Sequence, residues 1–466
     1  MSRTSEADRQ VAKTGLKRNV VAGAIGVLVH WFDWAIYAYL ATTIAVIFFP
    51  SQDGAAGLLS VFAVFAVAFF VRPVGSLIFG HLGDRYGRKK TLSIVIVTMA
   101  AGTLLLGLIP SYDSIGILAP ILLVVARIIQ GIAAGGEFGS AAAFLAEYAP
   151  TKRRGLGVSW LEFGSVLGFL LASLVVAGLH FWLDPAEVLA WGWRIPFLLT
   201  VPLALVGLYI RLKIEDTPEY QALQELDTVS SAPIREVFSH NSKQFFQTIG
   251  IEIFMNCTFY VVLVYLITYQ EQMVGMPNDQ AAVLSAVASL TAIAIIPLSG
   301  IVSDRVGRKP VLVTAGILLI LGSYPLFMLM NQGSVLAGFF STFGLAAILA
   351  LILGTHAVTV AELFPTRTRQ SGLSMAYSIA GAFFAGTLPY INTWLIDLTG
   401  NNMVPAFTLM VVGLIGLVTL YTMPETRGVD LLHDSDRAPA RAPSKNSKNS
   451  KNSKNSEGAE PDVARA

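Results

Sequence analysis

A cluster of polar side chains interrupts the first long apolar stretch of the sequence. His30 lies three residues before Asp33, and Tyr37 lies four residues after it. On a helix, these spacings place the three side chains on one face. A carboxylate beside an imidazole can accept and release a proton, because imidazole changes its charge near neutral pH. The spacing therefore predicts a proton-binding site that contains Asp33 and His30.

Other ionisable residues lie in apolar stretches further along the chain. Arg127 lies ten residues before Glu137, and on a straight helix this spacing is about 15 Å, too far for a direct ion pair. The guanidinium of Arg127 therefore needs an anion from another segment. Glu252 lies in a third apolar stretch, four residues before Asn256. Its carboxylate could bind a substrate or pair with a cation across a cavity.

The composition of the chain excludes a water-soluble globular protein. Hydrophobic residues make up 54% of the 466 positions and charged residues only 13%, and the mean hydropathy is +0.63. This number of charged residues is too small to cover a surface that faces water. The chain must therefore be surrounded by lipid. The net charge of +2 gives no reason to expect a nucleic acid as a partner. The single cysteine, Cys257, excludes an internal disulfide.

Apolar segments of spanning length recur along the whole chain. A membrane-spanning helix needs about 20 apolar residues, and an unpaired strand in lipid would leave its backbone groups without partners. We therefore predict an all-α membrane protein. The 12 predicted transmembrane helices lie near residues 20–48, 57–81, 91–110, 115–147, 157–181, 195–213, 243–270, 280–304, 311–330, 334–362, 372–397 and 402–424.

Basic residues follow every second predicted span. They are Arg85, Arg88, Lys89 and Lys90, then Lys152, Arg153 and Arg154, then Arg305, Arg308 and Lys309, and finally Arg367 and Arg369. The alternate loops, such as 271–279 and 331–333, carry no Lys or Arg, and only Arg194 departs from the pattern. Cytoplasmic loops are enriched in Lys and Arg, so we expect both termini in the cytoplasm. No signal-peptide cleavage site, which would consist of small residues, follows the first span. This span is therefore expected to stay in the mature protein.

A long polar stretch divides the chain into two halves. We predict a cytoplasmic N-terminus, a six-helix bundle, a cytoplasmic linker, a second six-helix bundle and a disordered cytoplasmic tail, at 1–19, 20–213, 214–242, 243–424 and 425–466. The tail carries repeated Lys-Asn-Ser tripeptides and no apolar run. Such a composition cannot bury enough apolar surface to fold.

The two halves repeat the same motifs. The segment GHLGDRYGRKK recurs 220 residues later as GIVSDRVGRKP, and AEYAPTKRRG has a counterpart in AELFPTRTRQSG at an offset of 215. Parallel repeats of this kind are typical of transporters whose halves rock around a central site. The acidic and basic residues of the repeats can form a latch that breaks and reforms. The predicted gating residues are Asp84, Arg85, Arg88, Glu147, Asp304, Arg305, Arg308 and Glu362.

These repeated loops resemble the signature loops of the major facilitator superfamily. HWFDWAIYAYLA, RPVGSLIFGHLGDRYGRKK, RIIQGIAAGGEFGSAAAFLAEYAP, WGWRIPF and EDTPEY resemble more narrowly the metabolite:proton symporters, and proline/betaine-type symporters most of all. The resemblance covers about residues 20–424. It implies two pseudo-symmetric bundles, uptake of a small molecule with protons by alternating access, no cofactor beyond the proton motive force, and a bacterial-type inner membrane.

The resemblance also places the candidate site residues around one cavity. Helices 1, 4, 7 and 10 line the cavity in this superfamily, so Asp33 is the favoured partner of Arg127, and a substrate carboxylate could replace it. The proton-coupling residues are then Asp33, His30 and Arg127, although relatives usually have Glu where this chain has His30. The predicted substrate-binding residues are Arg127, Tyr37, Trp34, Glu137, Glu252, Asn256 and Tyr260.

Several other functions remain open at this stage. The substrate could be a zwitterionic osmolyte, a dicarboxylate or α-keto acid, or an aromatic acid. A drug/proton antiporter would share the fold, but GVSWLEFGSVLGFLL lacks the Gly-Pro pair of those exporters. No HExxH, GxSxG or Walker motif supports an enzyme. We expect a monomer in the lipid bilayer, and a non-transporting sensor is the alternative from another class.

Overall fold

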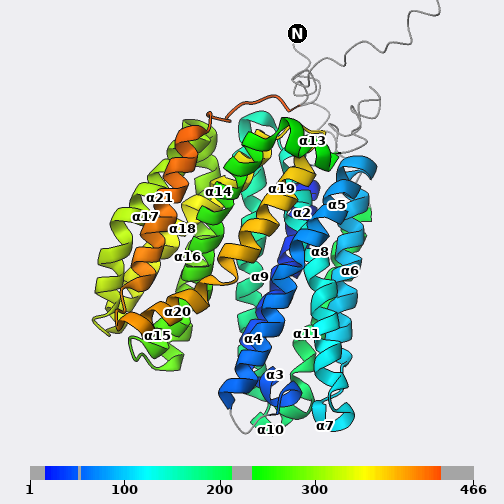
Figure 1. Cartoon of the computed structure of the whole chain (residues 1–466), viewed down its shortest axis with the longest axis vertical. Coiled ribbons are helices and arrows are strands. Elements are labelled where there is room, and N and C mark those ends of the chain that lie inside the picture. Colours follow the sequence, from blue (N-terminus) through cyan, green and yellow to red (C-terminus); the bar gives the residue numbers. More distant parts are fainter. Residues whose placement is uncertain (1–15, 51–53, 213–232, 432–466) are drawn as a thin grey trace, which may run out of the picture.

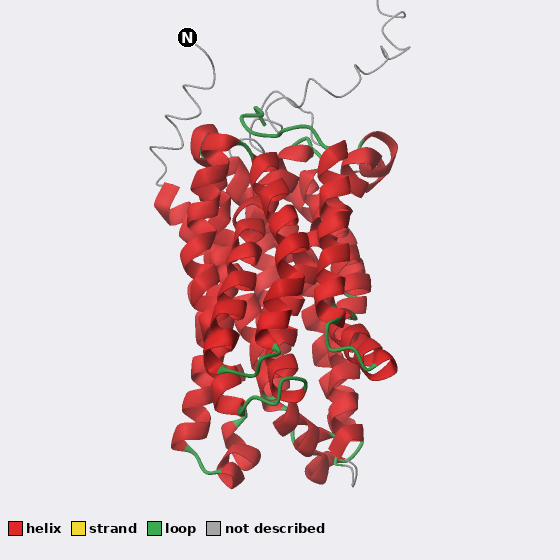
Figure 2. Ribbon diagram, turned by 90° about the vertical axis from the view of Figure 1, so that its left-hand side faces the viewer, coloured by secondary structure: helices red, strands yellow, loops and turns green. Residues whose placement is uncertain are grey.

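The computed structural model describes residues 16–50, 54–212 and 233–431, and within these ranges it contains helices and loops but no strand. Among the described residues, ten helices are long and apolar enough to cross a membrane, or up to 12 if each of two bent pairs counts as one span. The predicted all-α membrane fold is therefore confirmed. The helices run nearly parallel to the long axis of the molecule (Figure 2).

The first half of the chain forms one bundle. Its elements are α2 (Leu16–Tyr39), α3 (Ala41–Phe48), α4 (Gly54–Phe70), α5 (Arg72–Tyr86), α6 (Arg88–Leu108), α7 (Tyr112–Ile115), α8 (Leu118–Tyr148), η1 (Thr151–Arg153), α9 (Arg154–Trp182), α10 (Pro185–Glu187), η2 (Val188–Gly192) and α11 (Arg194–Leu212). The first predicted span is bent by 64° between α2 and α3, and the short helical segment Pro185–Gly192 meets the start of α11, the sixth predicted span, at 47°.

The second half forms a matching bundle. Its elements are α13 (Pro233–His240), α14 (Ser242–Phe259), η3 (Tyr260–Tyr265), α15 (Leu266–Gln272), α16 (Asn278–Val306), α17 (Arg308–Met330), α18 (Val335–Leu363), α19 (Arg369–Ala380), η4 (Gly381–Ala385), α20 (Leu388–Thr399) and α21 (Val404–Thr422). The segments η3 and η4 are π-helical turns inside longer helices. Such turns often mark functional sites.

The two bundles lie side by side and meet at one end of the molecule. Figure 1 shows α13, the start of α2 and the end of α21 at this end, which we call the α13 end. There α5 packs against α19, and α9 packs against α16. The ribbons of the two bundles diverge toward the opposite end (Figure 1). The bundles are thus joined by helices from both halves of the chain.

The repeated motif has the same local structure in both halves. Gly87 separates α5 from α6 with φ of 101°, and Gly307 separates α16 from α17 with φ of 111°. Residues with a Cβ rarely adopt these angles, so glycine is required at both turns. The sequence repeat is therefore a structural repeat as well.

The chain after α21 departs from the predicted disordered tail. The Glu425 carboxylate accepts hydrogen bonds from the backbone N–H groups of Arg308 (2.8 Å) and Lys309 (3.0 Å). Leu431 is buried, and its carbonyl oxygen accepts from Thr366 Oγ1. The prediction is therefore wrong for residues 425–431, because their polar groups find partners at the start of α17, at the end of α18 and in the loop that follows α18. The tail beyond 431, and residues 213–232 of the linker, lie outside the described residues.

Candidate functional site

Asp33 lies inside the first bundle, where it contacts α6 and α8. The Nε2 group of Gln130 donates to Asp33 Oδ2 at 2.8 Å and also lies 2.8 Å from Thr103 Oγ1. All three side chains are buried. The second carboxylate oxygen, Oδ1, finds no hydrogen-bond partner among the described residues. Asp33 is therefore a buried carboxylate with one oxygen free to take a proton.

Arg127 is buried beside Asp33 but does not pair with it directly. Its guanidinium carbon lies 3.5 Å from the centroid of the Tyr37 ring and 5.7 Å from that of Trp34. No ion pair within the described ranges joins Arg127 to Asp33, although the two charges interact electrostatically. Its nitrogens Nε, Nη1 and Nη2 lack hydrogen-bond partners there. The aromatic faces provide the main neighbours of this cation.

His30 pairs with Glu137, a contact that the sequence did not predict. His30 Nδ1 lies 2.9 Å from Glu137 Oε2, and both side chains are buried. The imidazole also stacks on Trp34, with ring centroids 5.7 Å apart. The pair joins α2 to α8, so His30 belongs to a second titratable pair within the same bundle as Asp33.

Arg72 is a buried cation that the sequence reasoning missed. Its side chain is 1% exposed and lies over two rings, 4.0 Å from the centroid of Trp34 and 4.2 Å from that of Phe69. Its Nε and Nη2 groups have no hydrogen-bond partner in the described part of the chain. Pro73 follows it and interrupts the helical ladder between α4 and α5. A charge inside the predicted span 57–81 was the signal that could have identified it.

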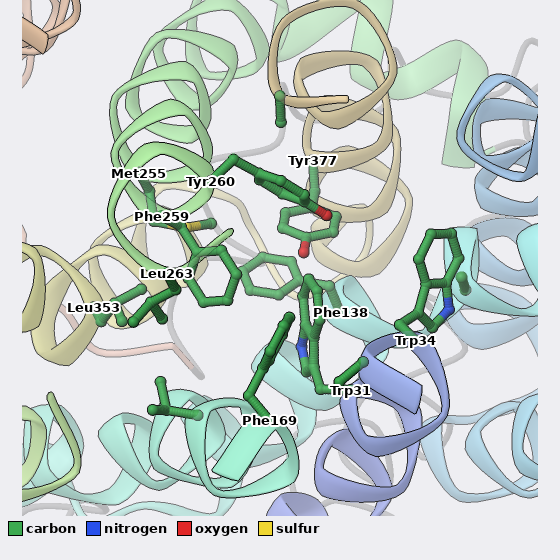
Figure 3. Close-up of a cluster of buried hydrophobic side chains, with 14 of the residues drawn as sticks. Trp31, Trp34, Phe138, Phe169, Met255, Phe259, Tyr260, Leu263, Leu353 and Tyr377 are labelled. Atoms are coloured by element: carbon green, nitrogen blue, oxygen red, sulfur yellow. The ribbon is translucent and has the colours of Figure 1, made fainter. Parts of the chain in front are cut away.

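Aromatic side chains from both bundles meet at the centre of the molecule. Phe138 of α8 stacks on Tyr377 of α19 with centroids 4.0 Å apart, and Trp31 of α2 lies 5.3 Å from Phe259 of α14. Figure 3 shows the Tyr260 and Tyr377 hydroxyl groups pointing toward the side of Trp31 and Trp34. The Tyr260 hydroxyl has no hydrogen-bond partner among the described residues.

Two buried carboxylates lie near this aromatic layer. Glu252 of α14 is fully buried and accepts a hydrogen bond from Asn256 Nδ2 at 3.3 Å. Its other oxygen, Oε1, has no partner within the described ranges. Glu162 of α9 lies 3.6 Å from His356 Nε2 of α18, so this contact crosses from one bundle to the other. Glu162 and Glu252 are close enough to interact electrostatically.

The repeated aspartates join the bundles at the α13 end. Asp84 of α5 accepts hydrogen bonds from the backbone N–H groups of Gln370 (3.2 Å) and Ser371 (2.8 Å), at the start of α19. Asp304 of α16 accepts in the same way from Gly155 (2.8 Å) and Leu156 (2.9 Å), at the start of α9. A carboxylate at a helix N-terminus is stabilised by the helix dipole. Each half therefore caps a helix of the other half.

Buried ion pairs reinforce the same contact. Glu362 pairs with Arg308 of its own bundle at 3.2 Å and with Arg154 of the other bundle at 3.1 Å. Glu147 pairs with Arg369 across the bundles at 2.7 Å, and both side chains are fully buried. The predicted gating residues Asp84, Asp304, Glu147, Glu362 and Arg308 thus lie together.

Of the three remaining predicted gating residues, two have side chains that face away from this contact's buried ion pairs. Arg85 and Arg305 are exposed, and the guanidinium of Arg85 lies 5.4 Å from the ring of Tyr86. The side chain of Arg88 lies outside the described part of the structure. Arg154 and Arg369, which the sequence reasoning assigned only to basic loops, supply the cations that cross the interface.

The chain resembles known membrane transporters over most of its length. Residues 23–353 and 272–451 match the Major Facilitator Superfamily. The glycine betaine/proline/ectoine/pipecolic acid transporter OusA of Dickeya dadantii is 38% identical over 420 residues, which cover 88% of this chain and 84% of the relative. The proline/betaine transporter of Escherichia coli K12 is 37% identical over 423 residues, with the same coverage.

Solved structures share the fold. The proton:xylose symporter XylE bound to 6-bromo-6-deoxy-D-glucose superposes with a TM-score of 0.76 at 19% identity. The match covers 91% of this chain and 98% of the symporter. It confirms the arrangement of two six-helix bundles that the sequence repeat predicts.

Proposed function

Because this chain belongs to the Major Facilitator Superfamily, and within it to the metabolite:proton symporters that include proline/betaine transporters, we propose that it imports a zwitterionic osmolyte or another small carboxylate-bearing metabolite together with protons. It is a transporter and not an enzyme. The ion gradient drives transport, and no cofactor is involved. Transport proceeds by alternating access, in which the two bundles rock around the central residues.

The buried carboxylate of Asp33 is the observation that carries proton coupling. One oxygen is held by Gln130 and the other has no donor in the described part of the chain. When Asp33 is ionised, it balances the nearby charge of Arg127. When Asp33 takes up a proton, Arg127 loses this balance and can attract an anionic group of the substrate. The same change would link proton binding to substrate binding.

The His30–Glu137 pair is the second candidate for proton coupling. Its two groups can share one proton at 2.9 Å, so the pair can be neutral or charged without a large movement. In this proposal His30 takes over part of the coupling role that the family resemblance gives to a Glu at this position. Both coupling elements lie in the first bundle, next to the same Trp34 ring.

We assign the α13 end to the cytoplasm, because the basic loops lie there and cytoplasmic loops are enriched in Lys and Arg. In this assignment the bundles are latched on the cytoplasmic side, and the structure corresponds to the outward-facing half of the cycle. Opening to the cytoplasm requires the cross-bundle ion pairs of Glu147 and Glu362 to separate. The location we propose is a bacterial inner membrane, with the protein acting as a monomer.

An uptake assay tests this function. Labelled proline, glycine betaine and α-ketoglutarate are supplied to cells that lack their own carriers, with and without an uncoupler. We expect accumulation of a zwitterion that the uncoupler abolishes. Accumulation of α-ketoglutarate alone would support the dicarboxylate alternative, whereas a lower cell content than in control cells would indicate an antiporter.

A further inference from the structure

Glu162 and His356 form a buried contact between the bundles that the proposed coupling does not use. Glu162 Oε1 on α9 lies 3.6 Å from His356 Nε2 on α18, and both residues are buried. The candidate coupling residues Asp33 and His30, in contrast, make their contacts inside the first bundle. A contact between the bundles is made and broken when the bundles move relative to each other. It can therefore respond directly to opening and closing.

The pair lies deeper in the molecule than the cross-bundle ion pairs at the α13 end, which we call the latch. His356 precedes the last residue of α18, Leu363, by seven positions, and Glu162 follows the first residue of α9, Arg154, by eight. At about 1.5 Å per residue, both lie roughly 10 to 12 Å inside the α13 end. The central ring of Phe138 (Figure 3) stacks on the imidazole, with ring centroids 5.8 Å apart. The pair is thus located between the latch and the central aromatic side chains.

The backbone determines which nitrogen of the neutral His356 ring carries the proton. Nδ1 lies 3.3 Å from the carbonyl oxygen of Ile352. A carbonyl oxygen can only accept a hydrogen bond, so the proton of the neutral ring is on Nδ1. Nε2 of the neutral ring then carries a lone pair. Among the described residues, Nε2 has no hydrogen-bond partner.

An ionised Glu162 cannot form a favourable contact with this neutral ring. The carboxylate and Nε2 are then both acceptors, so their lone pairs would face each other in a buried contact. One added proton removes this conflict. It produces either a carboxylic acid that can donate toward Nε2 or an imidazolium that pairs with the carboxylate. The closed interface therefore requires one proton on the pair.

The neighbouring helices provide no cation in place of this proton. Glu252 of α14 interacts electrostatically with Glu162, and two ionised carboxylates at this contact would repel each other. Tyr377 of α19 is a further titratable neighbour and interacts with both carboxylates. Charged residues of α2, α8, α16 and α17 have their own ion-pair partners, namely His30 with Glu137, Glu147 with Arg369, and Arg308 with Asp304 and Glu362. Within the described ranges, only the imidazole of His356 lies within ion-pair distance of Glu162.

We infer that Glu162 and His356 form a second proton-binding site, which the two bundles complete together and which holds its proton while the α13 end is closed. This inference rests on the alternating access of the proposed function. When the bundles separate at this end, water reaches both groups, the carboxylate ionises and the proton passes to the water. A bound proton therefore favours the closed state, and its loss favours opening.

The population of the closed state as a function of pH tests this site. Spin labels at Tyr86→Cys and Val306→Cys, which are exposed positions on α5 and α16, report the distance across the α13 end. The full chain is measured in nanodiscs without substrate, in the Cys257→Ser background. Glu147→Gln is added to weaken the latch, so that both states are populated. We call this chain the parent.

The closed state binds one proton more than the open state, so it should dominate at acidic pH. In a titration from about pH 5 to about pH 9, the ratio of open to closed molecules should rise by up to about tenfold per pH unit. Glu162→Gln should abolish this rise and keep the parent mostly closed, because its amide always carries a donor for Nε2. Glu162→Asp keeps a carboxylate and should keep the rise. His240→Gln, at an exposed position on α13, is the matched control and should titrate like the parent.

Each result supports or overturns one statement. If Glu162→Gln titrates like the parent, or if the parent shows no dependence on pH, the proton site between the bundles is overturned while the proposed function stands. If His30→Gln abolishes the rise and Glu162→Gln does not, the proton that controls closure belongs to the first bundle. If the distance changes neither with pH nor with saturating proline or glycine betaine, the bundles do not rock and the proposed function itself fails.

Discussion

Asp33, Gln130 and Thr103 form a buried polar network whose members come from three helices. The Gln130 amide bridges the carboxylate and the hydroxyl at 2.8 Å each. Spacing along one segment could identify Asp33 and Arg127 as charges within spans, but it could not select their partners, because these come from other helices. Gln130 lies three residues after Arg127 and therefore on the same helical face, which was the available signal.

Removal of the bridging amide tests this network. Gln130→Leu leaves Asp33 Oδ2 and Thr103 without their shared partner, so we expect a loss of about 1–3 kcal/mol in the free energy of unfolding. Thr103→Val removes one end of the same network, and the double variant should be less destabilised than the sum of the two single variants. Strict additivity in denaturant titrations would contradict a connected network.

His30 provides a second test at the scale of one residue. His30→Gln preserves the size of the side chain and a hydrogen-bonding group near Glu137, but it removes proton binding. If the pair contributes to coupling, accumulation at a fixed proton gradient should fall about tenfold, with substrate affinity changed much less. We would measure both quantities in the same preparation. Unchanged accumulation would reduce the pair to a structural contact between α2 and α8.

At the scale of elements, the repeated motif predicted the latch but only part of its composition. The aspartates cap α9 and α19 of the opposite bundle, as a duplicated Asp at a helix end suggests. The cations that cross the interface are Arg154 and Arg369, which the sequence grouped with basic loops. Their role depends on how the bundles dock, and no local pattern encodes that geometry.

Breaking a buried pair should open the α13 end. Glu147→Gln leaves the buried Arg369 without its ion-pair partner, a change that costs about 3 kcal/mol or roughly a hundredfold in population. Spin labels at Tyr86 and Val306, which are exposed on the two bundles, would report the change as a longer distance. The background carries Cys257→Ser, because Cys257 is the only native cysteine.

An exposed pair at the same end supplies the matched control. Glu236 and Arg367 lie 3.2 Å apart with side chains 29% and 25% exposed. Surface pairs contribute about 0–1 kcal/mol, so Glu236→Gln should leave the distance distribution unchanged. Equal effects of the two substitutions would show that burial does not determine the strength of the latch.

At the scale of the whole molecule, the start of α2, the end of α21 and α13 lie on one side, as an even number of spans requires (Figure 1). Composition, spacing of apolar runs and the internal repeat were sufficient to predict this architecture. The central site was harder to predict, because residues such as Phe138 and Tyr377, which stack on each other, become neighbours only when the two bundles meet. The hydrogen bonds of residues 425–431 were hard to predict for the same reason, since their partners lie in α17 and α18.

The orientation that we propose rests on the basic loops and can be tested on the whole molecule. Ser239→Cys on α13 and Gln332→Cys between α17 and α18 are both exposed positions at opposite ends. In the Cys257→Ser background, a membrane-impermeant maleimide should label Gln332→Cys in intact cells and Ser239→Cys only after lysis. The reverse pattern would place the α13 end outside the cell.

Transport by purified protein in liposomes tests proton-coupled uptake most directly. An imposed gradient with an alkaline interior should drive glycine betaine or proline above its external concentration, and an uncoupler should release it. Asp33→Asn should still exchange labelled for unlabelled substrate but should no longer accumulate it. Accumulation that survives either the uncoupler or Asp33→Asn would contradict proton coupling through this carboxylate.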